Sequence, residues 1–216
     1  WTPDGSEVIP NIAESFTVNE DGTSFTFQLR EGLKWSDGEP FTSADIQFWW
    51  DRVENNPDIN AGGPYRIFVV DGEAATVTSD GDYSVTFSWS NPNGLFLENL
   101  AGPYGVRVTQ FPRHYVEQFD NQANPDGVAQ MMADAGQTSY GQWWISRVGT
   151  YGQAAEYNDP ARPSLQLWIP TAAYIGEAQF TFERNPYYFK VDTACNQLPY
   201  IDARTFTLAT DPELRL

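Results

Sequence analysis

Residues 9–50 read IPNIAESFTVNEDGTSFTFQLREGLKWSDGEPFTSADIQFWW and hold the strongest local signals of the chain. Apolar and polar side chains alternate on both sides of the turn at residues 19–22, which predicts a β-hairpin with one apolar face. Thr42 and Asp45 have the spacing of a capping box, so we expect a helix to begin there. The residues on the apolar side of that helix would be Ile46, Trp49, Trp50 and Val53. This stretch therefore predicts scaffold rather than catalytic chemistry.

The same stretch carries three motifs in a fixed order. They are P-x-x-A-E-S-F from Pro10, D-G-T-x-F-T-F-x-L-R-x-G from Asp21, and K-W-S-D-G-E-P-F-T-x-x-D from Lys34. Together they resemble the signature of the family 5 extracellular solute-binding proteins, the receptors of oligopeptide, dipeptide and nickel ABC importers. Further similar segments follow in the family's order at residues 91–101, 112–115, 183–188 and 196–202. The resemblance covers nearly the whole chain, and its N-Q-L-P-Y-I-D segment is similar to that of a long-chain branch.

The resemblance implies an α+β fold, periplasmic-binding-protein type II-like, forming a partial first lobe with a mixed sheet and peripheral helices. Residues 1–163 would form the small inserted α+β subdomain, and residues 164–216 a partial segment of the main ligand-bearing subdomain. Family members are longer and close a cleft between two lobes. We therefore expect the chain to be a fragment of a longer receptor whose signal peptide lies outside it.

The resemblance also implies a function. The intact receptor would capture a solute, an oligopeptide, for an ABC importer and present it to the permease as a monomer in the periplasm or outside the cell. Whether a lipid anchors the full-length protein is left open. Neither enzymatic activity nor a cofactor is expected. The resemblance places Tyr65 and Tyr104 close to the rim of the family's cleft and Trp168 near a strand that enters the main lobe, so these three are the candidate ligand-binding residues.

The composition is strongly acidic, with 29 acidic against 12 basic residues and a formal net charge of −17. Nucleic acid and anionic lipid are poor partners for such a chain, because binding them requires Lys and Arg to replace counterions. Cationic ligands are allowed, although an acidic surface that raises solubility explains the charge more simply. No apolar run approaches the roughly 20 residues that span a bilayer.

Catalytic and metal-binding chemistry finds little support. His114 is the only histidine, and its place at a predicted helix start favours a capping or packing role. Cys195 is the only cysteine, so it has no partner within the chain for a disulfide or a metal site. Residues 56–62 contain Asn56, Asp58 and Asn60 but depart from a calcium loop in the position of the glycine and in lacking the bidentate Glu. We expect a polar turn there.

The remaining periodicity predicts a mixed fold. Alternating or apolar runs indicate strands at residues 65–70, 83–89, 165–169, 179–183 and 200–208. Capping and turn signals indicate helices at residues 95–100, 113–119, 125–135 and 139–148. In each aromatic pair, Trp49-Trp50, Trp143-Trp144 and Tyr187-Tyr188, we expect one ring to pack while the other faces outward.

Two other classes of function remain as alternatives. A stand-alone carbohydrate-binding module would use exposed aromatic rings, and it requires those rings to form one flat strip rather than to be scattered and mostly buried. An acid hydrolase would require two carboxylates that converge in one pocket with different pKa values. The ordered series of motifs favours the solute receptor over both.

Overall fold

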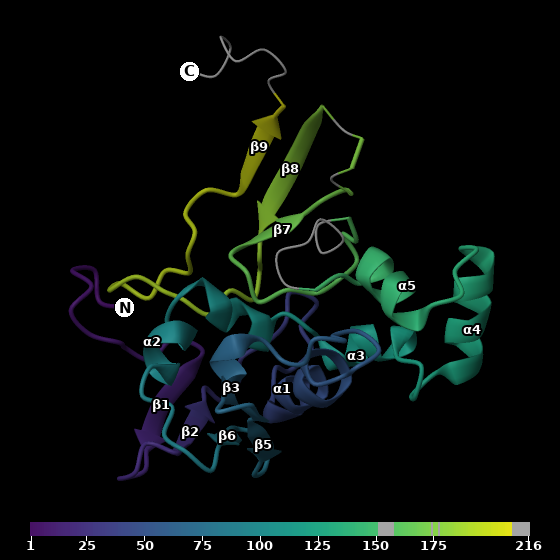
Figure 1. Ribbon diagram of the computed structural model, residues 1–216. Helices are drawn as coiled ribbons and strands as arrows, with labels where there is room; N and C mark the ends of the chain where they lie inside the picture. Colours follow the sequence, from purple (N-terminus) through teal and green to yellow (C-terminus); the bar gives the residue numbers. More distant parts are fainter. Residues whose placement is uncertain (151–157, 174, 177, 209–216) are drawn as a thin grey trace.

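The computed structural model describes residues 1–150, 158–173, 175–176 and 178–208. Its first sheet has four antiparallel strands in the order β1-β2-β6-β5 (Figure 1). These strands are β1 (Ala13–Val18), β2 (Ser24–Leu29), β6 (Ser84–Ser88) and β5 (Thr76–Ser79). The predicted hairpin is confirmed, since Phe16 of β1 lies opposite Phe27 of β2. Burial of this face fixes the register, because a slip by one residue would turn the phenylalanines into solvent.

Helix α1 (Ser43–Trp49) packs against β5 and β6 and continues as a π-helical turn, η1 (Trp50–Glu54). The predicted capping box is present, with the Thr42 backbone N–H donating to Asp45 Oδ2 at 2.9 Å. The four residues predicted for the apolar side are all at most 3% exposed: Ile46, Trp49, Trp50 and Val53. Local capping and burial against the sheet therefore select the same helix.

Aromatic rings fill the space between the sheet and the helices. Phe96 of α2 (Phe96–Leu100) is fully buried, and its ring centroid lies 4.8 Å from that of Trp89 and 5.3 Å from that of Phe87. Phe68 is also fully buried and lies 6.0 Å from Phe96. The contacts of Phe96 with Trp89 and Phe68 are edge-to-face, and such contacts add to the stabilisation that comes from burial alone.

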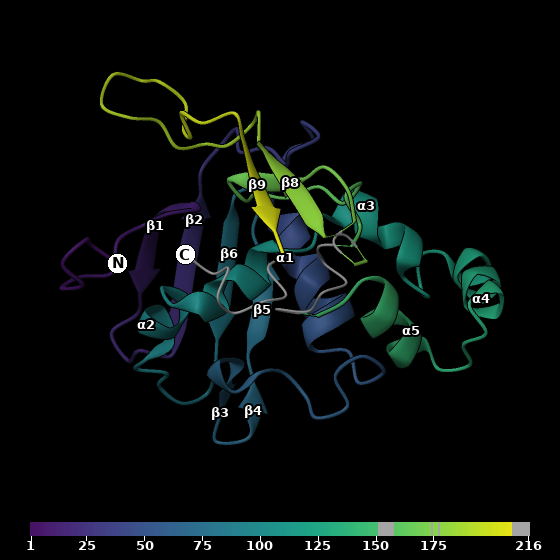
Figure 2. The same cartoon turned by 90° about the horizontal axis from the view of Figure 1, so that it is seen from above.

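The other elements of residues 1–150 complete this part of the molecule. They are the 3₁₀-helices η2 (Arg66–Phe68), η3 (Pro103–Thr109) and η4 (Glu117–Phe119), the short strands β3 (Val69–Val70) and β4 (Glu73–Ala74), and the helices α3 (Arg113–Val116), α4 (Pro125–Asp134) and α5 (Tyr140–Arg147). Seen from above, α4 lies at the end of the molecule opposite β1 (Figure 2). The helices predicted in this part of the sequence are confirmed within a residue or two at their ends.

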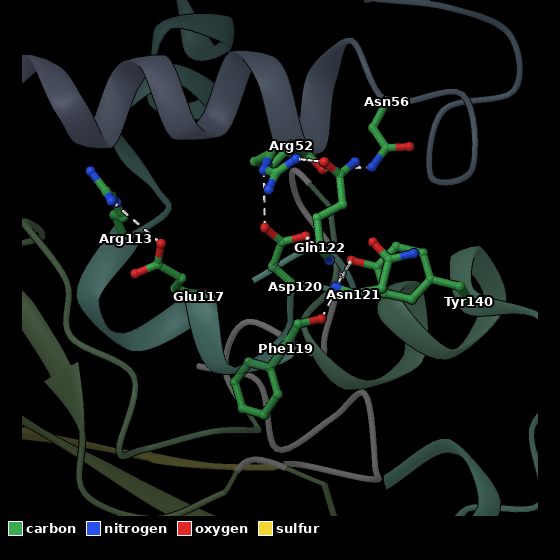
Figure 3. A network of polar contacts seen from close by, with 9 residues as sticks. All are labelled: Arg52, Asn56, Arg113, Glu117, Phe119, Asp120, Asn121, Gln122 and Tyr140. Atoms are coloured by element: carbon green, nitrogen blue, oxygen red, sulfur yellow. Dashed lines mark hydrogen bonds and ion pairs between the residues drawn. The ribbon is translucent and has the colours of Figure 1, made fainter. Parts of the chain in front are cut away.

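A polar network attaches η1 to the loop after η4 (Figure 3). Arg52 Nε lies 3.0 Å from Asp120 Oδ2, and the Arg52 guanidinium also donates to the Gln122 side chain. Asp120 is only 1% exposed, and burial makes such a pair costly to break from one side. The Tyr140 hydroxyl donates to the Phe119 carbonyl at 3.4 Å, so α5 belongs to the same network.

A second sheet consists of three antiparallel strands in the order β7-β8-β9 and, within the described residues, shares no strand with the first. Its strands are β7 (Trp168–Pro170), β8 (Gln179–Arg184) and β9 (Ala203–Thr207). In Figure 1 this sheet stands at the opposite side of α1 from the first sheet. Asn185 ties the end of β8 to the segment before β7, because its side-chain amide donates to the Ser164 carbonyl at 3.1 Å and to the Gln166 carbonyl at 3.0 Å.

Three predictions of strands are corrected. Residues 65–70 form the 3₁₀-helix η2 followed by only two strand residues, because the adjacent Ile67 and Phe68 are both buried, which a half-exposed strand cannot achieve. The strands predicted from Leu165 and from Tyr200 begin at Trp168 and Ala203 instead.

The prediction for the tryptophan pairs is wrong. Trp49 and Trp50 are 1% and 3% exposed, and their ring centroids lie 5.2 and 5.8 Å from that of Phe68. Trp143 and Trp144 are likewise buried. Each helix is covered on more than one side, so neighbouring residues that point in different directions both find apolar partners.

Candidate functional site

Tyr65 and Tyr104, two of the predicted ligand-binding residues, lie in contact. Tyr65 precedes η2 and Tyr104 lies in η3, and their ring centroids are 4.9 Å apart with an interplanar angle of 35°. Both side chains are half-buried, so part of each ring faces solvent. The two 3₁₀-helices thus bring together residues that are distant in sequence and present them as one aromatic surface.

A buried carboxylate holds this surface in place. Glu54, at the end of η1, is 3% exposed and accepts a hydrogen bond from the Tyr65 backbone N–H at 2.7 Å. Its other oxygen lies 3.4 Å from the Arg107 guanidinium, which in turn lies 4.6 Å from the Tyr65 ring centroid. Arg107 therefore neutralises Glu54 and covers part of the Tyr65 ring, so the position of Tyr65 is fixed by both its backbone and its side chain.

Arg66 supplies an exposed positive charge beside the two rings. Its guanidinium carbon lies 5.9 Å from the Tyr65 ring centroid. Hydrogen bonds from Tyr65, and then from Arg66, lower the pKa of Tyr104, and hydrogen bonds to both tyrosines raise the pKa of Arg66. The site thus combines two phenols with one guanidinium at the surface, an arrangement suited to binding polar or anionic groups of a ligand.

Trp168, the third predicted residue, lies in another part of the molecule. It begins β7, in register with Arg184 of β8, and the Arg204 guanidinium carbon lies 5.0 Å from its ring centroid. The structure therefore joins Tyr65 to Tyr104 and leaves Trp168 on the second sheet. Sequence reasoning missed Glu54, Arg66 and Arg107. The only signals for them were that Arg66 is adjacent to Tyr65 and that Arg107 follows Tyr104 by three residues.

The residues considered for catalysis or metal binding have structural contacts. His114 Nε2 lies 2.7 Å from Asp37 Oδ2, and its ring lies 6.5 Å from that of Trp35, so it attaches α3 to the turn at residues 35–38. Cys195 is an exposed free thiol at a turn. Within the described part of the chain no group of three or more His, Cys, Asp or Glu side chains could hold a metal ion.

The amides of the predicted polar turn at residues 56–62 bind backbone groups instead of facing a common centre. Asn60 Nδ2 donates to the carbonyls of Val53 at 2.9 Å and Glu54 at 3.0 Å, and Asn56 Nδ2 donates to the Arg52 carbonyl at 3.0 Å. These contacts satisfy carbonyl groups that the end of a helix leaves open. This turn therefore holds the end of η1, where Glu54 lies, and so helps to position the tyrosine pair.

An apolar cavity of about 450 Å³ borders η3 at Gly105 and Val106, although neither Tyr65 nor Tyr104 lines it. Phe16 and Phe27 line it from the first sheet, Leu97 and Leu100 from α2, and Phe189 from the segment that follows β8.

Among the described helices, none is long and apolar enough to cross a membrane.

Comparison with known structures defines the class of fold. Over 97% of its length the chain matches an oligopeptide-binding protein OppA with a TM-score of 0.82 and 32% sequence identity, covering 31% of that protein. It also matches the periplasmic binding protein MelB of Agrobacterium fabrum C58, solved in complex with stachyose, with a TM-score of 0.67 and 26% identity. The fold is thus that of part of a periplasmic binding protein, with mixed sheets and helices.

The chain belongs to the bacterial extracellular solute-binding proteins, family 5, whose family model, described as the "Middle" region, matches residues 7–216. It is 32% identical to the periplasmic alpha-galactoside-binding protein of Rhizobium meliloti (strain 1021) over 96% of the chain, which spans 26% of that relative. It is 37% identical to the dipeptide-binding protein of Escherichia coli (strain K12) over 44% of the chain, which is 20% of that relative.

Proposed function

We propose that this chain is part of a receptor that captures an oligopeptide outside the cytoplasmic membrane and delivers it to an ABC permease. In this proposal residues 1–163 form the small inserted subdomain and residues 164–216 contribute to the ligand-bearing subdomain. The receptor acts as a monomer and has no enzymatic activity. The observation that carries the proposal is the match of the family and of the fold over nearly the entire chain.

Tyr65 and Tyr104 are the proposed ligand contacts of this part of the receptor. Their half-exposed rings give a rigid surface, because Glu54 and Arg107 hold Tyr65 in place without any ligand. Such preorganisation reduces the ordering cost of binding. Trp168 would serve as a separate contact on the second sheet. Closure of a second lobe over these residues would exclude water and bury the ligand.

An alpha-galactoside is the second candidate ligand. It is favoured by the relative from Rhizobium meliloti, which matches 96% of the chain, and by the stachyose complex of MelB. Tyrosine rings can stack on sugar faces as well as pack on peptide side chains. The peptide is favoured by the higher TM-score with OppA.

A stand-alone carbohydrate-binding module fits the structure less well. Most of the tryptophans are buried, including Trp35, Trp49, Trp50, Trp89, Trp143 and Trp144. Within the described residues, the large aromatic side chains that are most exposed belong to separate segments: Trp1, Tyr187, Tyr200 and Phe206. Exposed rings that come from separate segments favour a scattered arrangement over one flat sugar-binding strip.

The test has two arms. Mass spectrometry of small molecules released from the full-length receptor should find peptides, and finding only galactosides would replace the peptide by the sugar. Calorimetric titration of residues 1–216 with a peptide library should give binding no tighter than about millimolar, because part of one lobe must offset association costs of roughly 4–15 kcal/mol. Saturable micromolar binding would show that the chain carries a complete site, and would contradict the need for a second lobe.

A further inference from the structure

The exposed guanidinium of Arg66 is the feature of the tyrosine site that its scaffold does not explain. In the part of the chain that the structure describes, ion pairs with carboxylates are formed by Arg52, Arg107, Arg113, Arg147 and Arg184, and none is formed by Arg66. The chain has 29 acidic residues against 12 basic ones, so carboxylates are abundant. Arg66 instead lies beside two phenol rings, with its charge directed to the surface.

The neighbouring charges leave Arg66 as the excess charge of the site. Glu54 is neutralised by Arg107 at 3.4 Å, and the Glu54 oxygen that is not paired accepts from the Tyr65 backbone. Among the residues that the structure describes, one positive charge therefore remains at the edge of the tyrosine pair, in a protein with a formal net charge of −17. A local field of this sign favours an anionic group at short range, where screening by salt is weakest.

Tyr104 adds a directed donor. Its ring centroid lies 4.9 Å from that of Tyr65, whose ring lies beside the Arg66 guanidinium, and these two neighbours, Tyr65 first, lower the pKa of the Tyr104 phenol. A phenol with a lowered pKa is a stronger hydrogen-bond donor. The Tyr104 O–H and the remaining N–H groups of Arg66 can then donate to the same anionic oxygen atoms, as in charge-assisted recognition of carboxylates.

We propose that Arg66 and Tyr104 form a carboxylate-binding subsite that recognises an anionic end or side chain of the captured peptide. This inference rests on the proposed receptor function and adds the chemistry of its ligand. Arg66 supplies the positive charge and two or more N–H donors, and Tyr104 supplies one O–H donor. Glu54 and Arg107 hold Tyr65 in position. Glu54 and Arg107 are positioning residues, because they act through Tyr65.

The test compares ligands that differ only in one carboxylate. Residues 1–216 are titrated, with detection by ¹H–¹⁵N NMR, with an N-acetylated tripeptide as the free acid, its C-terminal amide, and an amide that carries an internal Glu. We expect the free acid or the internal-Glu peptide to bind about tenfold more tightly than the neutral amide, and to shift the signals of Tyr65, Arg66 and Tyr104. The ligand that gains affinity identifies the source of the carboxylate.

Variants then assign the effect to residues. Arg66→Gln should abolish the preference for the carboxylate, and Tyr104→Phe should reduce it while keeping the ring. Arg113→Gln is the matched control, because it removes an arginine that is 50% exposed on α3 and should leave the preference unchanged. Each variant must retain the wild-type NMR spectrum outside the site, so that the loss of a ligand contact is distinguished from unfolding.

The outcomes separate the subsite from the receptor function. Equal binding of acid and amide, or a preference that survives in Arg66→Gln, overturns the carboxylate subsite and leaves the receptor function intact. Shifts at Tyr65 and Tyr104 with the neutral trisaccharide raffinose, but with none of the peptides, overturn both the subsite and the peptide ligand. No response of these residues to any of the probes also overturns the subsite.

Discussion

Ser36 and Ser164 exchange hydrogen bonds across the junction of the two sheets. The Ser36 backbone N–H donates to the Ser164 carbonyl at 3.1 Å, and the Ser164 backbone N–H donates to Ser36 Oγ at 3.0 Å. Ser36 lies in the K-W-S-D-G turn, and Ser164 lies in the segment that leads to β7. The turn that carries the family motif therefore anchors the beginning of the second sheet.

Replacing Ser36 by Ala tests this junction. The variant loses the acceptor for the Ser164 N–H and should lose about 0.5–1.5 kcal/mol of the free energy of unfolding. Denaturant unfolding measures the loss. Ser6→Ala, in an exposed turn near the N-terminus, serves as the control and should change stability by less than about 0.5 kcal/mol. A loss for Ser36→Ala as small as that of the control would show that the bond to Ser36 Oγ contributes nothing measurable, while the backbone bond between the two residues remains.

Trp35 should be one of the main structural side chains of the chain. It is 1% exposed, and its ring lies 5.4 Å from that of Phe41. Trp35→Ala is expected to lower the free energy of unfolding by roughly 3–5 kcal/mol, as for other large buried aromatics. Trp1→Ala is the matched variant, because Trp1 is 47% exposed and should cost far less. A loss below about 1 kcal/mol for Trp35→Ala would contradict the scaffold role of this turn.

Gly38 is favoured by its backbone conformation and lies against the Tyr187 hydroxyl. Its φ is +95°, and a Cβ atom there would lie 3.0 Å from the Tyr187 hydroxyl oxygen. Gly38→Ala should therefore destabilise the protein by more than the about 1–2 kcal/mol that a left-handed backbone costs alone. In a Tyr187→Ala background the contact is gone, and the cost should fall to that backbone part. An unchanged cost in the double variant would exclude the contact as a cause.

Asp45 should give the stability of the protein a distinctive dependence on pH. Its carboxylate accepts from the backbone N–H groups of Thr42 and Arg113, both at 2.9 Å, and desolvation by burial raises its pKa above 3.8. The folded state therefore holds this proton more tightly than the unfolded state. The resulting stabilisation is complete below the unfolded pKa and is lost as the pH rises through the folded pKa.

Comparison of wild type with Asp45→Asn isolates this effect, because the amide does not titrate. The stability of the wild type relative to the variant should fall as the pH rises above about 4 and through the raised pKa of Asp45. Denaturant unfolding at several pH values measures this difference, with the exposed Asp21→Asn as the reference for removing one charge. A relative stability that rises with pH would mean that hydrogen bonding outweighs burial at Asp45.

Local sequence signals predicted much of the first sheet and its helices. The hairpin with Phe16 opposite Phe27 and the capping box at Thr42 depend on neighbours within a few residues, so alternation and spacing were sufficient to find them. The same signals failed at residues 65–70, where an apolar run was taken for a strand. Ile67 and Phe68 are buried by elements that are distant in sequence, so no pattern within residues 65–70 could predict their burial.

The sequence by itself determined the family, through motifs at fixed spacing, and the hairpin and capped helix that those motifs build. The tertiary structure alone decided that Tyr65 meets Tyr104 while Trp168 stands on another sheet, and that Glu54 and Arg107 hold the tyrosine pair. The physical reason is that capping and alternation act over a few residues. A side-chain cluster instead depends on where packing against α1 brings η2 and η3 together.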